Sequence, residues 1–158
     1  MVAEKQKYLL IVAHAPSENT LLMRDRVVKG AATSNTDRVI VNCSSPFDAT
    51  PIEVKQADGI ILGTTENLGY MSGALKDFFD RVYYPCLDHT QGIPYVLYIR
   101  AGHDGTGTKR AVEKITTGLK WKVVNSPLIC RGEWQDSFLT ECEELGALMA
   151  TGIDAGIF

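Results

Sequence analysis

The sequence lacks every feature that would place the protein in a membrane or outside the cell. No apolar stretch approaches the ~20 residues that a membrane-spanning helix needs. No small-residue cleavage site follows the short apolar run near the N-terminus, so no signal peptide is expected. The four cysteines, Cys43, Cys86, Cys130 and Cys142, form no C-x-x-C pair and have no histidine at metal-ligand spacing. We therefore expect a cytoplasmic protein with reduced cysteines and no metal site.

Positive charge is also scarce. Lysine and arginine number 16 against 19 aspartates and glutamates, which gives a net charge of −3, and the basic residues are scattered along the chain. Nucleic-acid binding, which needs a basic patch, is therefore not expected. The 158 residues are 45% hydrophobic, which is enough to form one domain with a sizeable core. We expect a single domain over residues 1–158 and no membrane partner.

Familiar phosphate-binding motifs are missing as well. The chain has no G-x-x-x-x-G-K-[ST] motif, and Gly102, Gly105 and Gly107 run in the wrong order for G-x-G-x-x-G. A receiver domain would need acidic residues after its first strand and an aspartate at the end of its third, where this chain has His14 and Gly63-Thr64. No cysteine is followed six positions later by arginine, which excludes a phosphatase loop of that spacing.

Apolar runs and amphipathic segments alternate along the chain. Such continuous apolar runs are typical of parallel strands that are buried on both faces. The pattern predicts strands at residues 8–13, 38–42, 58–62 and 94–99, with strand-like segments at 122–124 and 127–130. Pro127 between the last two indicates an edge strand. We therefore predict an α/β fold with a parallel sheet and helices on both of its faces, joined by right-handed crossovers.

The most informative helix follows the strand at 58–62. Its apolar residues recur at i, i+4, i+7, i+8 and i+11, which is one face of a helix; they are Met71, Leu75, Phe78, Phe79 and Val82. Ser72 is the expected N-cap. A polar loop separates strand from helix, and ligands of open α/β sheets bind at the carboxyl ends of the strands. An ordinary connecting turn is the alternative interpretation.

The loop after the first strand is a second candidate for ligand binding. It leads into a helix N-terminus, where free N–H groups and the helix dipole favour an anion. Ser17, Asn19 and Thr20 can add donors, which suits a phosphate. The alternative is that Ser17 or Asn19 only caps the helix. A third loop at the same edge, residues 100–108, is rich in glycine.

The segment Gly63–Arg81 resembles the flavin loop and helix of flavodoxin-like NAD(P)H-dependent FMN reductases and quinone reductases. Their pattern is roughly T-P-x-Y-x-G-x-M-S-G-x-L-K-x-F-h-D-R, where h is hydrophobic. The matching residues are Thr64, Gly69, Met71, Ser72, Gly73, Leu75, Lys76, Phe78, Asp80 and Arg81. The first loop is similar to the flavodoxin phosphate loop, S-T-T-G-N-T. The chain departs from these patterns at Glu18, Thr65 and Asn67, where glycine, proline and an aromatic residue are usual.

The resemblance implies a flavodoxin-like, doubly wound, five-stranded parallel sheet in the order 2-1-3-4-5, with FMN across its carboxyl edge. The ring would lie between the Thr65–Met71 loop and the Gly102–Gly105 loop, with Gly69 and Tyr70 N–H groups near flavin N5 and Gly102 or His103 at the pyrimidine edge. No catalytic acid–base pair is expected, because the flavin carries the chemistry. The residues assigned to the cofactor are His14, Ser17, Asn19, Thr20, Thr65, Glu66, Asn67, Leu68, Gly69, Tyr70, Met71, Gly102, His103 and Gly105.

The resemblance leaves three functions open. The first is an oxidoreductase that passes electrons from NAD(P)H through FMN to a small acceptor such as a quinone or free flavin. For such a reductase the resemblance also implies a homo-oligomer. The second is a flavodoxin-type electron carrier, for which a net charge of −3 gives weak steering. The third is a flavodoxin-like domain with weak or lost flavin binding, which the residues Glu18, Thr65 and Asn67 favour.

Overall fold

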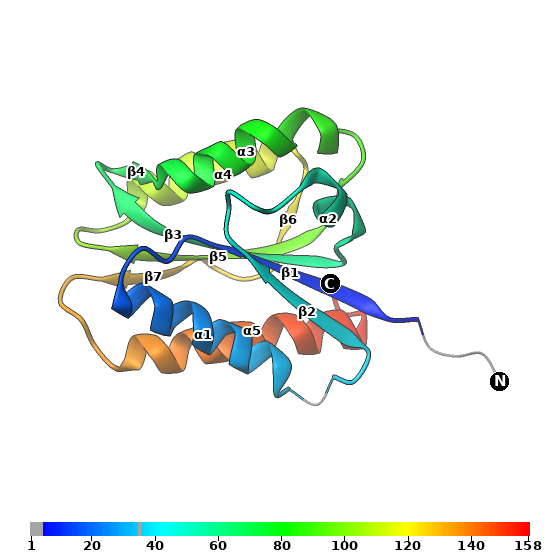
Figure 1. The fold of residues 1–158 in the computed structure, drawn as a ribbon, viewed down its shortest axis with the longest axis horizontal. Helices are drawn as coiled ribbons and strands as arrows, with labels where there is room; N and C mark the ends of the chain where they lie inside the picture. Colours follow the sequence, from blue (N-terminus) through cyan, green and yellow to red (C-terminus); the bar gives the residue numbers. More distant parts are fainter. Residues whose placement is uncertain (1–4, 35) are drawn as a thin grey trace.

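The computed structural model describes residues 5–34 and 36–158. One sheet lies between two layers of helices, with α2, α3 and α4 over one face and α1 and α5 over the other (Figure 1). The elements are β1 (Lys7–Ala13), α1 (Glu18–Ala32), β2 (Val39–Ser44), α2 (Pro51–Gln56), β3 (Gly59–Asn67), β4 (Tyr70–Met71), α3 (Gly73–Cys86), β5 (Pro94–Ala101), α4 (Thr106–Gly118), β6 (Lys122–Val123), β7 (Leu128–Arg131) and α5 (Ser137–Ala155).

The sheet has seven strands, and its main strands are parallel in the order β2-β1-β3-β5. The outer edge of β5 is covered by two short strands. β6 pairs with its first residues, Pro94 and Tyr95, whereas β7 pairs with the last four, 98–101. With β6 and β7 taken together as a broken fifth strand, the order is 2-1-3-4-5, so the predicted doubly wound topology is confirmed.

Both faces of the sheet are packed by apolar side chains, as the continuous apolar runs predicted. Alternate residues of β1, β3 and β5 point to opposite faces, so each strand contributes to both core clusters. The α3 side contains Phe78 and Phe79, which are fully buried, and Trp121 packs against Phe79. Within residues 5–34 and 36–158, no helix combines the length and the apolar character that crossing a bilayer requires.

Helix α3 begins directly after Ser72, the predicted N-cap, whereas Met71, which the periodicity placed on the helix face, lies in β4. The Ser72 hydroxyl is its N-cap and accepts a hydrogen bond from the Leu75 N–H at 3.2 Å. On the outer side, Arg81 pairs with Asp77 at 2.9 Å and also donates to the carbonyls of Ala49 (2.9 Å) and Pro46. The i,i+4 pair therefore also fixes the connection between β2 and α2 to this helix.

Candidate functional site

The carboxyl ends of β1, β3 and β5 meet at one edge of the sheet, on the left of Figure 1. β1 is flanked by β2 on one side and by β3 on the other, so the direction of strand addition reverses there. Ligands of open α/β sheets bind at such a switch point. The segments at 14–17, 65–71 and 102–105 all leave the sheet at this edge. The three predicted segments therefore share one location.

The segment predicted as a polar loop after β3 is a β-hairpin. β3 continues to Asn67, and Glu66 and Asn67 pair with Met71 and Tyr70 of the antiparallel strand β4. The turn residues Leu68 and Gly69 have φ angles of 53° and 73°, as both central residues of a type I′ hairpin turn do. The loop prediction for this segment was therefore wrong. The Leu68 side chain is fully exposed at the hairpin tip, with a relative accessibility of 106%.

Thr64 joins this hairpin to the start of α3. Its hydroxyl is buried, accepts a hydrogen bond from the Ser72 N–H at 3.0 Å and donates to the Thr65 carbonyl at 2.9 Å. A threonine at this position therefore satisfies the backbone between hairpin and helix. This contact gives the Thr64 of the sequence pattern a structural role.

The hairpin is also joined to the start of α4, across the candidate site. The Glu66 carboxylate accepts hydrogen bonds from the backbone N–H groups of His103 (3.1 Å) and Gly105 (2.8 Å). The Thr108 hydroxyl donates to the Tyr70 carbonyl at 2.9 Å. The His103 N–H, one of two donors predicted for the pyrimidine edge of the flavin, is therefore occupied by Glu66. The hairpin and the 102–105 loop are held together as one unit.

Close backbone contact reinforces this unit at Gly107. A Cβ atom at this position would lie 2.2 Å from the Gly69 carbonyl oxygen, which is far inside van der Waals contact. Only glycine allows the hairpin turn to approach α4 so closely. Gly107 and Thr108 were missing from the predicted site, although a glycine-rich helix start was visible in the sequence.

In the first loop, the two hydroxyls predicted to bind phosphate form a capping box instead. The Thr20 N–H donates to the Ser17 hydroxyl at 3.2 Å, and the Ser17 N–H donates to the Thr20 hydroxyl at 2.9 Å. The alternative interpretation of Ser17 as a helix cap is thus confirmed. The N–H groups of Glu18 and Asn19, in the first turn, have no intrahelical acceptor. They are the donors that this loop offers to an anion.

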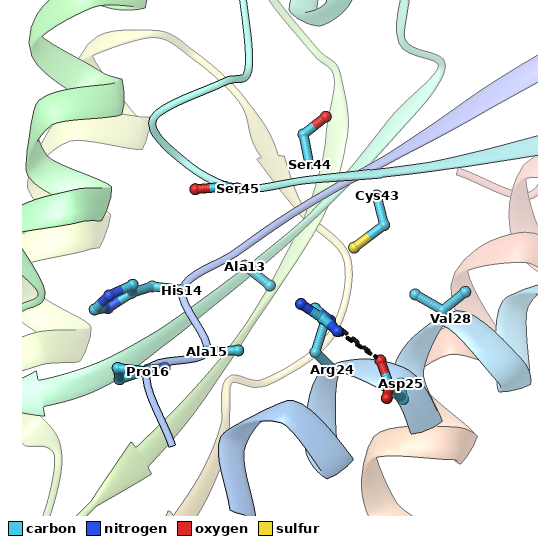
Figure 2. A pocket seen from close by; sticks show the side chains of 10 residues that line it. All are labelled: Ala13, His14, Ala15, Pro16, Arg24, Asp25, Val28, Cys43, Ser44 and Ser45. Atoms are coloured by element: carbon cyan, nitrogen blue, oxygen red, sulfur yellow. Dashed lines mark hydrogen bonds and ion pairs between the residues drawn. The ribbon is translucent and has the colours of Figure 1, made fainter. Parts of the chain in front are cut away.

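His14 belongs to the first loop and lines a cavity next to it. Its backbone N–H donates to the Gly63 carbonyl at 3.0 Å, and its Nδ1 atom is buried without a hydrogen-bond partner among the described residues. Burial lowers the pKa of His14, which favours the neutral imidazole at pH 7. The cavity has a volume of about 470 Å³, and Figure 2 shows the side chains that line it, from this loop, α1 and the end of β2.

A positive charge, a negative charge and a thiol line the cavity in Figure 2, but none of them is reactive. Arg24 is paired with Asp25 at 2.9 Å, so their charges compensate each other. Burial raises the pKa of the Cys43 thiol, which therefore stays protonated at neutral pH. The cavity has polar groups for a neutral ligand but no reactive thiolate.

Gly63 at the end of the apolar part of β3 makes room for Tyr98. A Cβ atom at residue 63 would lie 2.3 Å from the Tyr98 ring. The Tyr98 hydroxyl is buried with no hydrogen-bond partner among the described residues. Burial raises the pKa of Tyr98 well above its usual value, so the phenol is neutral. The sequence showed Gly63 but not its reason, because Tyr98 lies on the neighbouring strand.

Arg100 is a cation at the site edge that sequence reasoning missed. It is the penultimate residue of β5, in register with Thr65 of β3. Its guanidinium packs over the rings of Trp134 (5.9 Å) and Phe138 (5.2 Å). It donates to three main-chain carbonyls, those of Ala101 (3.0 Å), Cys130 (3.0 Å) and Gly132 (2.7 Å). In residues 5–34 and 36–158 no carboxylate pairs with Arg100, so its positive charge is not neutralised by an acidic side chain.

Together these features suit a planar, anionic cofactor. The free N–H groups of Glu18 and Asn19 and the positive end of α1 can hold a phosphate. The rigid hairpin, with Leu68 exposed at its tip, offers a flat apolar contact. A parallel sheet in this order with such an edge defines a flavodoxin-like α/β protein.

Solved structures support this class. An archaeal flavodoxin superposes with a TM-score of 0.78 at 22% identity, over 92% of this chain and 98% of that chain. A WrbA-like flavodoxin from Agrobacterium tumefaciens gives 0.74 at 18% identity, over 95% and 99%. Flavodoxin 1 from Bacillus cereus gives 0.73 at 20% identity, over 92% and 98%. At these identities the likeness shows the fold alone.

The family follows from the sequence match. The family model described as NADPH-dependent FMN reductase matches residues 41–136, more than half of the chain. The chain therefore belongs to the NADPH-dependent FMN reductase family, and the resemblance of Gly63–Arg81 is confirmed. No curated protein matches the sequence. Family and fold together support a flavin-binding oxidoreductase or a flavodoxin-type role with FMN as the cofactor. The match begins after the first loop, so it does not include Ser17–Thr20.

Proposed function

We propose that the chain binds FMN at this edge and passes electrons from NAD(P)H through FMN to a small acceptor such as a quinone or free flavin. The proposal rests on one observation: the β3–β4 hairpin is hydrogen-bonded to the 102–105 loop at the same edge of the sheet as the N-terminus of α1. The flavin supplies the redox chemistry, and the chain binds, orients and electrostatically tunes it.

The proposed phosphate site depends on the backbone of α1. The N–H groups of Glu18 and Asn19 bind the phosphate, and the helix dipole adds to the attraction. The hydroxyls of Ser17 and Thr20 accept the backbone N–H bonds of the capping box, and rotation of the hydroxyl hydrogen lets each donate to the phosphate as well. Glu18 carries an exposed carboxylate in the same turn, which opposes a phosphate. We therefore expect FMN to be bound less tightly than a glycine at position 18 would allow.

The proposed ring site is formed by the hairpin and the 102–105 loop. Leu68 and Tyr70 are exposed on the hairpin and take the place of the aromatic residue that Asn67 replaces. Gly102 offers its backbone to the pyrimidine edge, since the His103 N–H is bonded to Glu66. Arg100 adds a positive charge near the same edge. NAD(P)H and the acceptor reach the ring from the solvent side of this ring site.

A flavodoxin-type electron carrier is the second candidate. It is favoured by the length of the chain, which covers 98% of the archaeal and Bacillus cereus flavodoxins. Carriers of this kind find their partners through strong surface charge. The net charge of −3 is small for such steering, which favours the reductase.

Two measurements on purified protein test these functions. Titration of FMN into the apoprotein, followed by quenching of flavin fluorescence, measures binding; absence of binding would exclude both candidates. The loaded protein is then mixed anaerobically with NADPH and with NADH. Direct bleaching of the flavin absorbance supports the reductase, whereas reduction that occurs only through an added partner reductase supports the carrier.

A further inference from the structure

The carboxylate of Glu66 lies at the N-terminal end of α4. It accepts from the His103 N–H at 3.1 Å and from the Gly105 N–H at 2.8 Å. Gly105 is the N-cap of α4, and its own residue type gives the helix no side-chain cap. Glu66 comes from β3, 39 residues earlier than Gly105. A different element of the fold thus supplies the anion at this helix end.

The end of α4 that Glu66 occupies faces the hairpin. The Thr108 hydroxyl bonds the Tyr70 carbonyl at 2.9 Å, and Gly107 touches the turn, so the first turn of α4 forms one wall of the proposed ring site. Free N–H groups and the dipole make such a helix end attractive to anions. Because the Glu66 carboxylate is bound at this helix end, the chain itself supplies the negative charge there.

A second carboxylate, that of Asp104, is close in sequence but differs in its setting. It accepts from the Thr106 N–H (3.0 Å) and hydroxyl (2.9 Å) and is exposed. These hydrogen bonds lower the pKa of Asp104, so it is ionised at neutral pH. Its charge is screened by solvent. Asp104 therefore provides a matched control for a charge at the same helix that makes no bond to the hairpin unit.

We propose that Glu66 is a built-in anion that occupies the N–H groups of His103 and of the N-cap Gly105 at the start of α4 and so makes the flavin site favour oxidised over reduced flavin. The inference rests on the proposed function. Glu66 acts as a positioning residue: it holds the 102–105 loop against the hairpin and withdraws two N–H donors from any ligand. It forms no bond to substrate and transfers no proton.

The preference follows from charge. A hydride from NAD(P)H brings two electrons and one proton to the flavin and leaves NAD(P)⁺, and the flavin then carries additional negative charge. An open α4 end would stabilise that charge, whereas the fixed Glu66 carboxylate opposes it. The reduced flavin would thereby be a stronger donor of two electrons. With the proton that the flavin received in the hydride and a second proton from solvent, these electrons would convert a quinone to a quinol.

The first test uses the apoprotein, so it requires no flavin. Glu66→Gln keeps the size of the side chain and one strong acceptor but removes the charge. Inorganic phosphate is titrated while the amide resonances of His103 and Gly105 are recorded. We expect no saturable shift in the wild type and a saturable shift in Glu66→Gln. Glu66→Ala is the second neutral variant, so that instability of either leaves the comparison possible.

The second test measures the dissociation constants of oxidised and reduced FMN. Relative to oxidised FMN, we expect Glu66→Gln to bind reduced FMN about tenfold more tightly than the wild type does, which equals a potential about 30 mV higher for a two-electron couple. Asp104→Asn, which removes an exposed charge, and Glu66→Asp, which retains the charge, should each change the ratio by less than about twofold.

The outcomes separate this inference from the proposed function. An unchanged ratio in Glu66→Gln, or the same shift in Asp104→Asn, overturns the inference and leaves the function standing. A wild-type chain that binds neither redox form overturns the proposed function, and the redox part of the inference with it. A phosphate response equal in wild type and Glu66→Gln shows that Glu66 does not fill the helix end.

Discussion

At the edge of the site, individual hydroxyl and N–H groups already form hydrogen bonds within the protein. Ser17 and Thr20 cap α1, and Thr64 satisfies the start of α3. The His103 N–H is bonded to Glu66. Polar residues that a sequence pattern assigns to a ligand are therefore first of all structural here, and their substitution affects folding as well as binding.

Thr20→Val separates these two effects. The substitution removes the hydroxyl that accepts from the Ser17 N–H, so we expect the free energy of unfolding to fall by about 1 kcal/mol. FMN binding should weaken by a few kcal/mol at most, which is the usual cost of a lost hydrogen bond to a charged group. Urea unfolding and FMN titration measure the two quantities.

Thr33→Val, at the other end of α1, is the control, because the Thr33 hydroxyl bonds the Lys29 carbonyl but lies away from the site. An unchanged FMN affinity in Thr20→Val would show that the phosphate contact is wrongly assigned. An unchanged stability would show that the capping box contributes nothing in solution.

His14 predicts how stability depends on pH. Burial lowers the pKa of His14 in the folded state below the unfolded value of about 6.5. The unfolded chain then binds the proton more readily, so this contribution to stability is present above pH 6.5 and is lost as the pH falls through the folded pKa. Urea unfolding at several pH values should show a shallower loss for His14→Gln than for the wild type.

The exposed His89, in the segment after α3, gives the matched variant. His89→Gln should retain the wild-type pH profile. If the profiles of wild type and His14→Gln coincide, the His14 imidazole is as well solvated in the folded state as in the unfolded one.

At the scale of elements, the β3–β4 hairpin organises the site. It is joined to α3 through Thr64 and to α4 through Glu66, so it fixes the spacing between two helix N-termini. Its turn places a leucine at φ 53°, a conformation that suits asparagine or glycine. Because Leu68 is large, apolar and exposed in an unfavourable conformation, we propose that the tip contacts a ligand.

Leu68→Asn tests whether Leu68 lowers the stability of the hairpin turn but strengthens FMN binding. Asparagine adopts positive φ more easily, so we expect the free energy of unfolding to rise by about 0.5–1 kcal/mol. FMN affinity should fall, because the apolar contact is lost. Leu68→Ala removes the same contact without relieving the backbone, so it should weaken FMN binding without the gain in stability. Equal FMN affinity in all three proteins would remove Leu68 from the ring site.

The elements differ in how far the sequence predicts them. α3 was found because its apolar residues repeat with the helical period and Ser72 precedes them, and both signals are local. The hairpin was missed because its turn is Leu-Gly rather than Asn-Gly and its strands are polar. The bonds of Glu66 join residues 37 and 39 positions apart, and Arg100 bonds a carbonyl 32 positions away. No local pattern contains such contacts.

At the scale of the whole molecule, net charge decides how partners are met. The chain has a net charge of −3 with scattered basic residues, and NADPH is an anion. Long-range forces between them are weak and are further screened by salt. On the proposed function, we therefore expect NADPH to be recognised by contact at the site rather than by attraction over a distance.

This gives an expectation for kinetics. The second-order rate of flavin reduction by NADPH should change less than about threefold between 0.05 and 0.3 M salt, because little charge is available to screen. Stopped-flow mixing over that range measures it. A steep decrease with salt would instead indicate charge-guided docking, as expected for an electron carrier.

The broken edge strand has a consequence for how this chain can be lengthened. β6 and β7 pair with opposite ends of β5. The exposed residues Asn125 and Ser126 lie between them and form no strand pairing. Added residues at this break would leave every main strand and the switch-point edge in place. The sheet thus contains a natural insertion point, at which a label can be added without rebuilding the proposed site.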